Sequence, residues 1–538
     1  MLRVNDPDLI AHWPLRENLE DHSKSGLSIK NHGVEIGESD GQKSAQFNGA
    51  ETFLEVPCNL SIGTGDFSCA GWIHTEETEV VGDILSQFDP ETRQGWQVSV
   101  LTHTGMTCTA QSNYRNLHFG IDNGHLGSWT DCGRPGQAVK ISALSTIGGH
   151  LYAGTFENGK EEVGHLWRYE GEKHWTDLGN PVGCNSVNAV VEFKGALYCA
   201  LGRYNSSGSA MGDPLNTTPG GQVYRVDADG QWTFCGHPGI EDATPEETPT
   251  TGHNTGKADN ATALTVYQGR LYATSLYREG AFVYDGGTTW TPIGPDVRLM
   301  SFTIYRDRLY TLVNGGPVLR YEGNAEWTDC GCPETSTQTY SAVTFKGQLY
   351  VGTWPQGEVY RYDGKTTWTC LDRVGYEREI MAMGLYNGKV YVGSLPMANV
   401  WRMDGNRFTF LASLDRTSVP LRRVWSMAVY QGHLYAGTLP SGHVYSVEAG
   451  KVATWDHIFP EGWRHVAAVK QGGVLTLYVD GTPVATTDSF NPKRYDLNPN
   501  CPLLIGFGAH DYFKGALRDI RIYRRGLTQR EIQDLARD

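Results

Sequence analysis

Charged and polar side chains recur at one position of a repeated pattern, directly before each of seven short apolar runs. In chain order this position holds Lys140, Ser186, Asn260, Arg298, Gln338, Glu379 and Arg423, with Asp259, Arg378 and Arg422 one residue earlier. The ends of neighbouring runs add Arg203, Tyr204, Tyr277, Arg278, Asn314 and Trp354. Arginine pairs bidentately with carboxylate or sulfate. If these side chains converge, they predict a binding site for an anionic ligand.

A purely structural reading of the same residues stays open. The arginines could pair with Asp259, Glu377 and Glu379 and with each other's loops. The residues named above, which we call the rim, would then bind no ligand.

Groups that could transfer protons lie in or near this rim. Two segments of the second repeat, 203–221 and 236–260, are much longer than their equivalents, and the second of them carries His253. We consider His253 as a base and Tyr204, Tyr277 or Tyr340 as an acid. Hydrolysis would need two carboxylates, and Asp259 with Glu379 is the pair that the repeat suggests. H-x-x-x-H, zinc-type C-x-x-C, G-x-S-x-G and Gly-rich phosphate motifs are absent.

The repeats themselves indicate the element that positions the rim. Each consists of an apolar strand, a G-x-L-Y strand, a V-Y-R-Y strand and, in most copies, a W-T strand. Four short strands per repeat are typical of a propeller blade. The seventh copy lacks its W-T strand, whereas residues 128–133 carry one before the first copy, so we expect this strand to close the last blade. The open edges of the sheets would then be hidden.

Segments at both ends of the chain carry the strands of a further domain. They include Ile10-Ala-His-Trp and Phe67-Ser-Cys-Ala-Gly-Trp-Ile near the start, and Trp463-Arg-His-Val-Ala and Ala516-Leu-Arg-Asp-Ile near the end. These motifs resemble the laminin-G, concanavalin A-like family, in which the W-x-H-V-A strand directly follows the N-terminal strands. We therefore expect an all-β protein, a seven-bladed β-propeller (126–455) inserted into a laminin-G-like β-sandwich, or jelly roll (1–125 and 456–538).

The resemblance also implies functions for the sandwich. Members of this family often bind glycans and often hold a structural calcium ion near an acidic residue of the last strand, which corresponds to Asp519. Calcium takes six to eight oxygens, and Asp519 is the one side-chain donor that can be named. A sandwich that only brackets the propeller is the alternative. No organic cofactor is expected.

Composition narrows the classes of partner. A net charge of −15 argues against a nucleic-acid binder, and no stretch approaches the length of a membrane span. Since the first residues lack the apolar core of an export signal, we expect a cytoplasmic protein, or a secreted or periplasmic one if a leader has been removed. Cys132, Cys235 and Cys330 each follow a Trp by three residues, which predicts small buried residues and not disulfides.

At fold level the propeller resembles polysaccharide lyases and glycoside hydrolases that act on uronate-containing glycans. A lyase needs a cation for the uronate carboxylate, a base for the C5 proton and an acid for the leaving oxygen. Arg378 or Arg423, His253 and one of the tyrosines would fill these roles. We therefore expect a glycan-cleaving enzyme, with hydrolysis or lectin-like binding as alternatives. An interaction hub would need a large exposed apolar patch, which the polar rim does not suggest.

Overall fold

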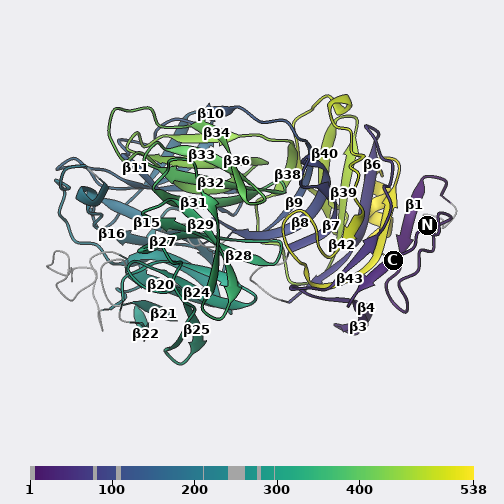
Figure 1. Ribbon diagram of the computed structural model, residues 1–538, viewed down its shortest axis with the longest axis horizontal. Coiled ribbons are helices and arrows are strands. Elements are labelled where there is room, and N and C mark those ends of the chain that lie inside the picture. The colour runs from purple at the N-terminus through teal and green to yellow at the C-terminus, as the bar shows by residue number, and fades with distance from the viewer. Residues whose placement is uncertain are drawn as a thin grey trace.

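The computed structural model describes residues 6–76, 82–103, 111–209, 211–239, 261–275, 280–295 and 297–537. These residues form strands almost throughout, arranged as a β-sandwich beside a β-propeller (Figure 1). Both ends of the chain lie on the sandwich, and the propeller is built from the middle of the sequence. In the described ranges no helix is long and apolar enough to cross a membrane.

The two ends of the chain fold into one sandwich because their strands alternate within each sheet. In the first sheet β6 lies between β43 and β39, and in the second sheet β42 lies between β7 and β5. The first sheet contains β1 (Leu9–Trp13), β3 (Glu35–Ser39), β4 (Gln42–Asn48), β6 (Phe67–Thr75), β39 (Gly462–Gln471), β40 (Val474–Val479), β41 (Thr482–Thr486) and β43 (Lys514–Tyr523). The second contains β2 (Lys30–His32), β5 (Phe53–Val56), β7 (Gly82–Asp89), β8 (Gln94–His103), β9 (Asn113–Asn123), β38 (Lys451–Trp455) and β42 (Leu503–Ile505).

Alternate residues of these strands bury an aromatic core between the two sheets. Trp96, Phe67 and Phe119 are fully buried, and the Phe67 ring lies 5.1 Å from Trp96 and 5.9 Å from Phe119, measured between ring centroids. Tilted and edge-to-face pairs of this kind add stability beyond the area that they bury. The C-terminal helix α1 (Gln529–Leu535) closes the domain, with Thr528 and Glu531 forming a capping box at its start.

The described part of the insert forms seven blades of four antiparallel strands. Their first strands contact one another in a closed ring from β11 through to β35 and back, so these strands line the axis. The blades are β11 (Lys140–Ile147), β12 (His150–Phe156), β13 (Leu166–Gly171) and β14 (His174–Gly179); β15 (Ser186–Phe193), β16 (Ala196–Gly202), β17 (Val223–Val226) and β18 (Trp232–Phe234); β19 (Ala261–Tyr267), β20 (Arg270–Ser275), β21 (Ala281–Gly286) and β22 (Thr289–Gly294); β23 (Leu299–Tyr305), β24 (Arg308–Val313), β25 (Leu319–Gly323) and β26 (Glu326–Asp329); β27 (Gln338–Phe345), β28 (Gln348–Trp354), β29 (Glu358–Gly364) and β30 (Thr367–Arg373); β31 (Glu379–Tyr386), β32 (Lys389–Leu395), β33 (Asn399–Asp404) and β34 (Arg407–Ser413); and β35 (Arg423–Tyr430), β36 (His433–Leu439), β37 (Val444–Val447) and β10 (Trp129–Asp131).

The last blade is completed by the first strand of the insert. β10 pairs antiparallel with β37, from Trp129 opposite Val447 to Asp131 opposite Tyr445. The next strand, β38, already belongs to the sandwich, since it pairs with β9 from Lys451 opposite Ile121 onward. The chain therefore re-enters the sandwich at residue 451, slightly before the boundary near 455 that the repeats suggested.

In the first five blades the tryptophan of the W-T strand joins its blade to the preceding one. The indole Nε1 of Trp175 donates to the carbonyl of Cys132 at 2.9 Å, and Trp290 and Trp368 donate to Cys235 and Cys330 in the same way. Trp232 and Trp327 repeat the contact with other carbonyls. Each acceptor lies three residues after the tryptophan of the preceding blade, and Cys132, Cys235 and Cys330 are buried at this position, as the sequence predicted. All ten cysteines in the described ranges are free.

The sandwich covers the face of the propeller that carries the hairpins between first and second strands. Four hairpin glycines donate their backbone N–H groups to it: Gly149 to the Asp456 carbonyl (2.8 Å), Gly347 to Asp511 Oδ1 (2.7 Å), Gly388 to His510 Nε2 (2.7 Å) and Gly432 to Thr454 Oγ1 (3.0 Å). At Gly432 a Cβ atom would lie 2.0 Å from the Val452 carbonyl, and φ is +74°, so only glycine fits.

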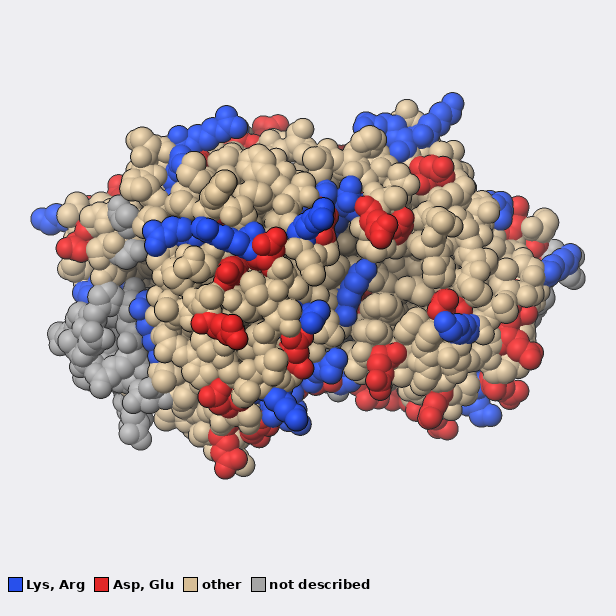
Figure 2. All heavy atoms as spheres, in the orientation of Figure 1, with Lys and Arg blue, Asp and Glu red and all other residues tan. Residues whose placement is uncertain are grey.

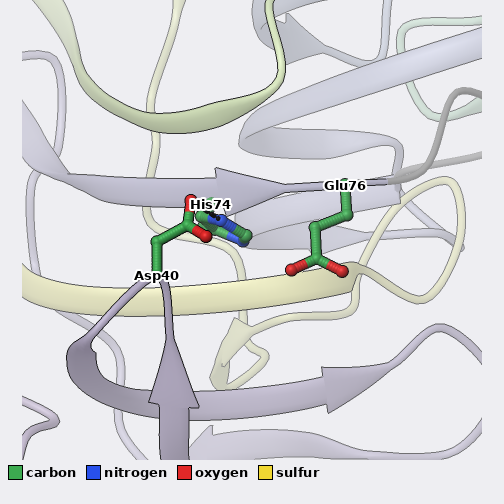
Figure 3. Close-up of side chains that lie close together, drawn as sticks. All are labelled: Asp40, His74 and Glu76. Carbon is green, nitrogen blue, oxygen red and sulfur yellow. Dashed lines mark hydrogen bonds and ion pairs between the residues drawn. The ribbon is translucent and has the colours of Figure 1, made fainter.

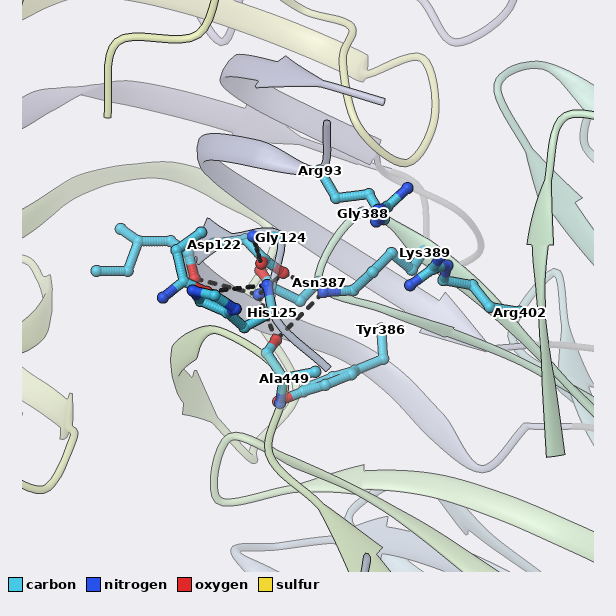
Figure 4. Close-up of polar contacts among 12 residues, drawn as sticks. Arg93, Asp122, Gly124, His125, Tyr386, Asn387, Gly388, Lys389, Arg402 and Ala449 are labelled. Atoms are coloured by element: carbon cyan, nitrogen blue, oxygen red, sulfur yellow. Dashed lines mark hydrogen bonds and ion pairs between the residues drawn. The ribbon is translucent and has the colours of Figure 1, made fainter. Parts of the chain in front are cut away.

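Polar side chains of β9 are buried in this junction (Figure 4). Lys389 of the sixth blade forms an ion pair with Asp122, and both side chains are almost fully buried. The Nδ2 of Asn387 donates to Asp122 at 3.1 Å and to the Ala449 carbonyl at 2.9 Å. The sandwich closes this face of the propeller. The first strands begin at the opposite end of the axis, which the sandwich leaves uncovered.

Candidate functional site

The first strands begin at the residues that the repeats singled out. Lys140, Ser186, Gln338, Glu379 and Arg423 are the first residues of β11, β15, β27, β31 and β35, and Arg298 directly precedes β23. Since these strands surround the axis, their first residues form a ring at its uncovered end. The ring position in the third blade, Asn260, lies outside the described residues.

A second ring lies two residues further along, at a β-bulge. In six of the first strands of the described structure, the register with the second strand shifts across a single residue. The residues at these bulges are Ser142, Asn188, Met300, Tyr340, Met381 and Trp425. A bulge bends its strand and redirects a side chain. Tyr340, Met381 and Trp425, from three successive blades, consequently pack in one cluster with Phe156 and Tyr204.

Tyr340 is surrounded by the charged groups of the first ring. Burial and the charge of Glu379 raise the pKa of Tyr340 well above its usual value, while the charges of Arg423 and Arg298 oppose this shift. The hydroxyl of Tyr340 donates to the Gln338 side chain. The phenol therefore stays protonated over a wide pH range, beside one acid and two cations.

Glu379 is buried beside a cation. Its carboxylate lies 3.7 Å from Arg423 Nη2, and it is 2% exposed. Burial raises the pKa of Glu379 to about 7, because desolvation outweighs the attraction of Arg423 and Arg378. A carboxyl group with this pKa can both accept and give up a proton near neutral pH.

Lys140 adds a buried cation to the same cluster. Its ammonium lies 3.3 Å from the centroid of the Tyr204 ring and 4.3 Å from that of Trp425. These are cation–π contacts in a desolvated setting, where such contacts are strongest. Tyr204 is 7% exposed, and its hydroxyl contacts the Ser209 hydroxyl in the 203–221 segment.

Other residues of the predicted site lie at the rim or turn away from the cluster. The Arg378 guanidinium is exposed and lies 4.6 Å above the Trp354 ring. Arg422 points elsewhere, since it donates to the Thr417 carbonyl (2.7 Å) and contacts the sulfur of Met397. Arg203, at the end of β16, is half-buried. His253, Tyr277 and Arg278, with Asp259, lie outside the described residues.

The structure thus brings together Tyr204, Tyr340, Glu379, Arg423 and Arg298, but not Arg422. The sequence reasoning did not single out Met381 or Trp425, and it counted Lys140 only as part of the rim. A signal for the bulge ring exists in the sequence, because each bulge residue is followed by Ala or Ser. These small residues are Ala143, Ala189, Ser301, Ser341, Ala382 and Ser426.

Asp519, expected near a calcium ion, is held by the side chains of two residues, His12 and Arg521. His12 Nε2 lies 2.6 Å from Asp519 Oδ1, and Arg521 Nη2 lies 3.0 Å from Oδ2. Burial raises the pKa of Asp519, but the His12 hydrogen bond and the Arg521 charge outweigh it, so the net shift is downward. This pairing satisfies the carboxylate within the chain. Calcium at Asp519 stays a prediction, and its binding would require these contacts to open.

A different set of side chains has the spacing of metal ligands. Asp40, His74 and Glu76 place one ligand atom each within 4.8 Å of one another, and His74 Nε2 bonds Asp40 Oδ2 at 2.8 Å (Figure 3). Asp40 lies in the turn between β3 and β4, and Glu76 directly follows β6. One imidazole with two carboxylates suits zinc better than calcium, which takes oxygen ligands.

Charge on the surface is mixed. On the face drawn in Figure 2, basic and acidic side chains are interspersed over both the propeller and the sandwich.

Comparison with known proteins identifies the sandwich. Residues 402–533 match the family model described as the concanavalin A-like lectin/glucanases superfamily. The match begins in β33 of the sixth blade and ends in α1, so it includes every strand of the C-terminal half of the sandwich, from β38 to β43. No curated protein matches the chain.

Similar solved structures include a virginiamycin B lyase from Staphylococcus aureus, with 9% identity over 60% of this chain and 99% of that one and a TM-score of 0.45. The extracellular domain of the hybrid two-component system BT4673 from B. thetaiotaomicron is 13% identical over 80% of this chain and 56% of that one, with a TM-score of 0.40. In fold, the chain is a seven-bladed β-propeller inserted into a β-sandwich of the concanavalin A-like, laminin-G type.

Proposed function

We propose that the side chains gathered at the uncovered end of the axis bind and cleave an anionic, uronate-containing glycan. We call this group, which consists of Tyr204, Arg298, Tyr340, Glu379 and Arg423, the axial cluster. The observation that carries the proposal is the buried pairing of Glu379 with Arg423, 3.7 Å apart at the uncovered end of the axis, close enough to Tyr340, together with Arg298, for their charges to act on its pKa. These are a protonated hydroxyl, an acid that titrates near neutral pH and two cations, and they are the groups that a β-elimination uses.

In the proposed reaction, Arg298 and Arg423 neutralise the uronate carboxylate, which makes the C5 proton more acidic. A base removes that proton, and the electron pair of the C5–H bond forms the C4=C5 double bond. The C4–O bond to the leaving sugar breaks, and the leaving oxygen takes a proton from the Tyr340 hydroxyl. Glu379 fits the base because its pKa is about 7. His253, predicted as the base from the sequence, lies outside the described residues.

Binding without cleavage is a second candidate function, favoured by the exposed Arg378 over the Trp354 ring at the rim. An aromatic ring and a guanidinium side by side can hold the face and the carboxylate of one sugar unit without any proton transfer. A hydrolase would need a second carboxylate opposite Glu379.

The test is an assay on uronate-rich and sulfated polysaccharides that follows both the absorbance of unsaturated uronate and the release of reducing ends. We expect Glu379→Gln and Tyr340→Phe each to lower kcat at least about 100-fold, as is typical when a general acid or base is lost. Tyr350→Phe, on the neighbouring strand β28 and outside the cluster, is the matched control and should leave kcat unchanged.

Two results would contradict cleavage. One is the absence of product over a broad panel of glycans. The other is glycan binding that survives Tyr340→Phe but is lost with Trp354→Ala, without turnover in either protein, which would favour the lectin-like function. New reducing ends without unsaturated uronate would replace elimination by hydrolysis.

A further inference from the structure

The sandwich places an imidazole between two carboxylates, on the face of β6 that points away from the core. His74 and Glu76 are two residues apart at the end of β6, and side chains at this spacing in an extended chain point to the same face. Asp40 comes from the turn between β3 and β4. One ligand atom of each residue lies within 4.8 Å of the others, with the imidazole in the middle (Figure 3). Among the described residues no other three His, Cys, Asp or Glu side chains come this close together.

One indole fixes both sides of this group. Trp463 lies opposite His74 on the neighbouring strand β39, the two rings pack with centroids 5.1 Å apart, and His74 is 2% exposed. The Nε1 of the same tryptophan donates to the carbonyl of Ser39, directly before Asp40, at 3.0 Å. Asp40 and Gly41 have φ of +47° and +71°, as in the two-residue Asp-Gly turns that close hairpins. The imidazole and the turn are therefore held in position by the fold itself.

An ion can reach these ligand atoms from solvent. The Asp40 side chain is 64% exposed, and Glu76 is exposed as well. Asp40 Oδ2 lies 2.8 Å from His74 Nε2, so a metal ion between these two atoms takes the place of the proton that they share. Glu76 has neither a hydrogen bond nor an ion pair in the part of the chain that the structure describes, so its carboxylate is available as a ligand.

The ligand atoms and their spacing fit zinc. Zinc binds imidazole nitrogen and carboxylate oxygen at about 2.0–2.2 Å, so the ligand atoms of a tetrahedral site are roughly 3.4 Å apart. Atoms within 4.8 Å of one another reach this spacing by small rotations of the exposed Glu76 side chain. Three protein ligands leave a fourth position for water. Calcium takes six to eight oxygens, and two carboxylates supply at most four.

We propose that Asp40, His74 and Glu76 bind a zinc ion that ties the β3–β4 turn to the end of β6. The ligands are His74 Nε2 and one oxygen of each carboxylate. The buried, fixed imidazole distinguishes this group from the exposed acidic pairs that are common on a chain with a net charge of −15. The ligands include neither Asp519 nor a residue of the axial cluster, so the proposal does not depend on calcium or on the cleavage proposed above.

The experiment titrates the full chain, freed of metal with a chelator, with zinc chloride and measures the heat of binding. We expect Glu76→Gln and Asp40→Asn each to weaken zinc binding at least about tenfold, because losing a ligand costs no less than losing a group that only orients one. Both substitutions keep the size of the side chain, and Asn tolerates the left-handed turn position. Glu55→Gln is the matched control, since Glu55 pairs with the His32 imidazole at 2.9 Å without a third ligand beside it among the described residues.

Cobalt(II) chloride is a second probe, because the free cysteines of the chain could also bind zinc. Cobalt at the proposed site should show no thiolate-to-cobalt charge-transfer band, since the ligands are nitrogen and oxygen, and its visible bands should weaken in Glu76→Gln. Zinc should also raise the midpoint of thermal unfolding more in the unaltered protein than in Glu76→Gln, because an ion that binds the folded state stabilises it.

Three results would overturn the proposal. They are equally tight zinc binding in Glu76→Gln and the unaltered protein, a thiolate charge-transfer band from the bound cobalt, and displacement of zinc by an equal concentration of calcium chloride. Tyr340→Phe should bind zinc as the unaltered protein does, which separates failure of the zinc site from failure of the axial proposal.

Discussion

Lys389 of the propeller and Asp122 of the sandwich form an ion pair that crosses the junction of the two domains, with 5% and 0% of their side chains exposed. A buried pair adds little stability compared with apolar residues, but removing one partner leaves a charge buried without compensation. The stability of the interface between propeller and sandwich should therefore be sensitive to the loss of either residue.

Lys389→Met should lower the free energy of unfolding by about 3–5 kcal/mol, the usual cost of breaking a buried pair on one side. Urea unfolding at neutral pH would measure it. Lys30→Met is the control, because Lys30 is exposed and pairs with Glu55 at 3.4 Å, so its loss should cost under about 1 kcal/mol. A loss for Lys389→Met as small as that of the control would contradict a structural role for the pair.

The contacts between blades lead to a second prediction. Trp368→Phe removes the indole N–H that donates to the Cys330 carbonyl, and it should destabilise the protein by about 1–3 kcal/mol, because a buried carbonyl is left without a donor. Trp401→Phe is the matched control, since the Nε1 of Trp401 has no hydrogen-bond partner among the described residues. Thermal unfolding of the two variants should differ clearly, and equal midpoints would refute the role of the tryptophan in joining blades.

Stability should also depend on the titration of Glu379, whose pKa in the folded protein is about 7 against 4.5 for the free side chain. Below pH 4.5 the group is protonated in both states. Between pH 4.5 and 7 the unfolded chain releases a proton that the folded protein keeps, so the free energy of unfolding falls as the pH rises; above pH 7 the loss is complete. The expected loss is about 3 kcal/mol.

Glu379→Gln cannot titrate and should lack this component. Urea unfolding at pH 5 and pH 8 would show it as a smaller difference in the variant than in the unaltered protein. The same pH dependence in both proteins would mean that the carboxyl group ionises normally in the folded state.

The repeats were sufficient to predict the propeller, because the blades repeat the same turns and most of them the same tryptophan. The family motifs at both ends were sufficient for the split sandwich. Neither source of information predicts how the two domains are joined. Asn387 and Lys389 look like ordinary turn residues in the sequence, and their burial against β9 becomes visible only when both domains are in place.

The candidate site was predictable where it depends on position within a blade, and not where it depends on a bulge or on rotamers. Glu379 and Arg423 stand at the start of their strands as expected. Trp425 was missed because only the positions at the start of each first strand and at the end of each second strand were considered, whereas Trp425 lies two residues into β35, at the bulge. Arg422 was assigned to the site although its guanidinium donates to the Thr417 carbonyl, a local contact that no sequence periodicity encodes.

The pairing of Glu379 with Arg423 leads to a final prediction. The Arg423 charge holds the pKa of Glu379 down, so Arg423→Gln should raise this pKa further above 7. The pH range in which the free energy of unfolding falls should then extend upward, and the protein should still lose stability between pH 7 and 9, where the unaltered protein has reached its plateau. Arg422→Gln is the matched control, since its guanidinium contacts Thr417 and not Glu379. If the free energy of unfolding levels off at the same pH in both variants, the Arg423 guanidinium does not act on Glu379. If it levels off at a higher pH in Arg423→Gln alone, the acid limb of any glycan-cleaving activity should also move to higher pH in this variant. The reason is that Glu379 must lose its proton before it can act as the base.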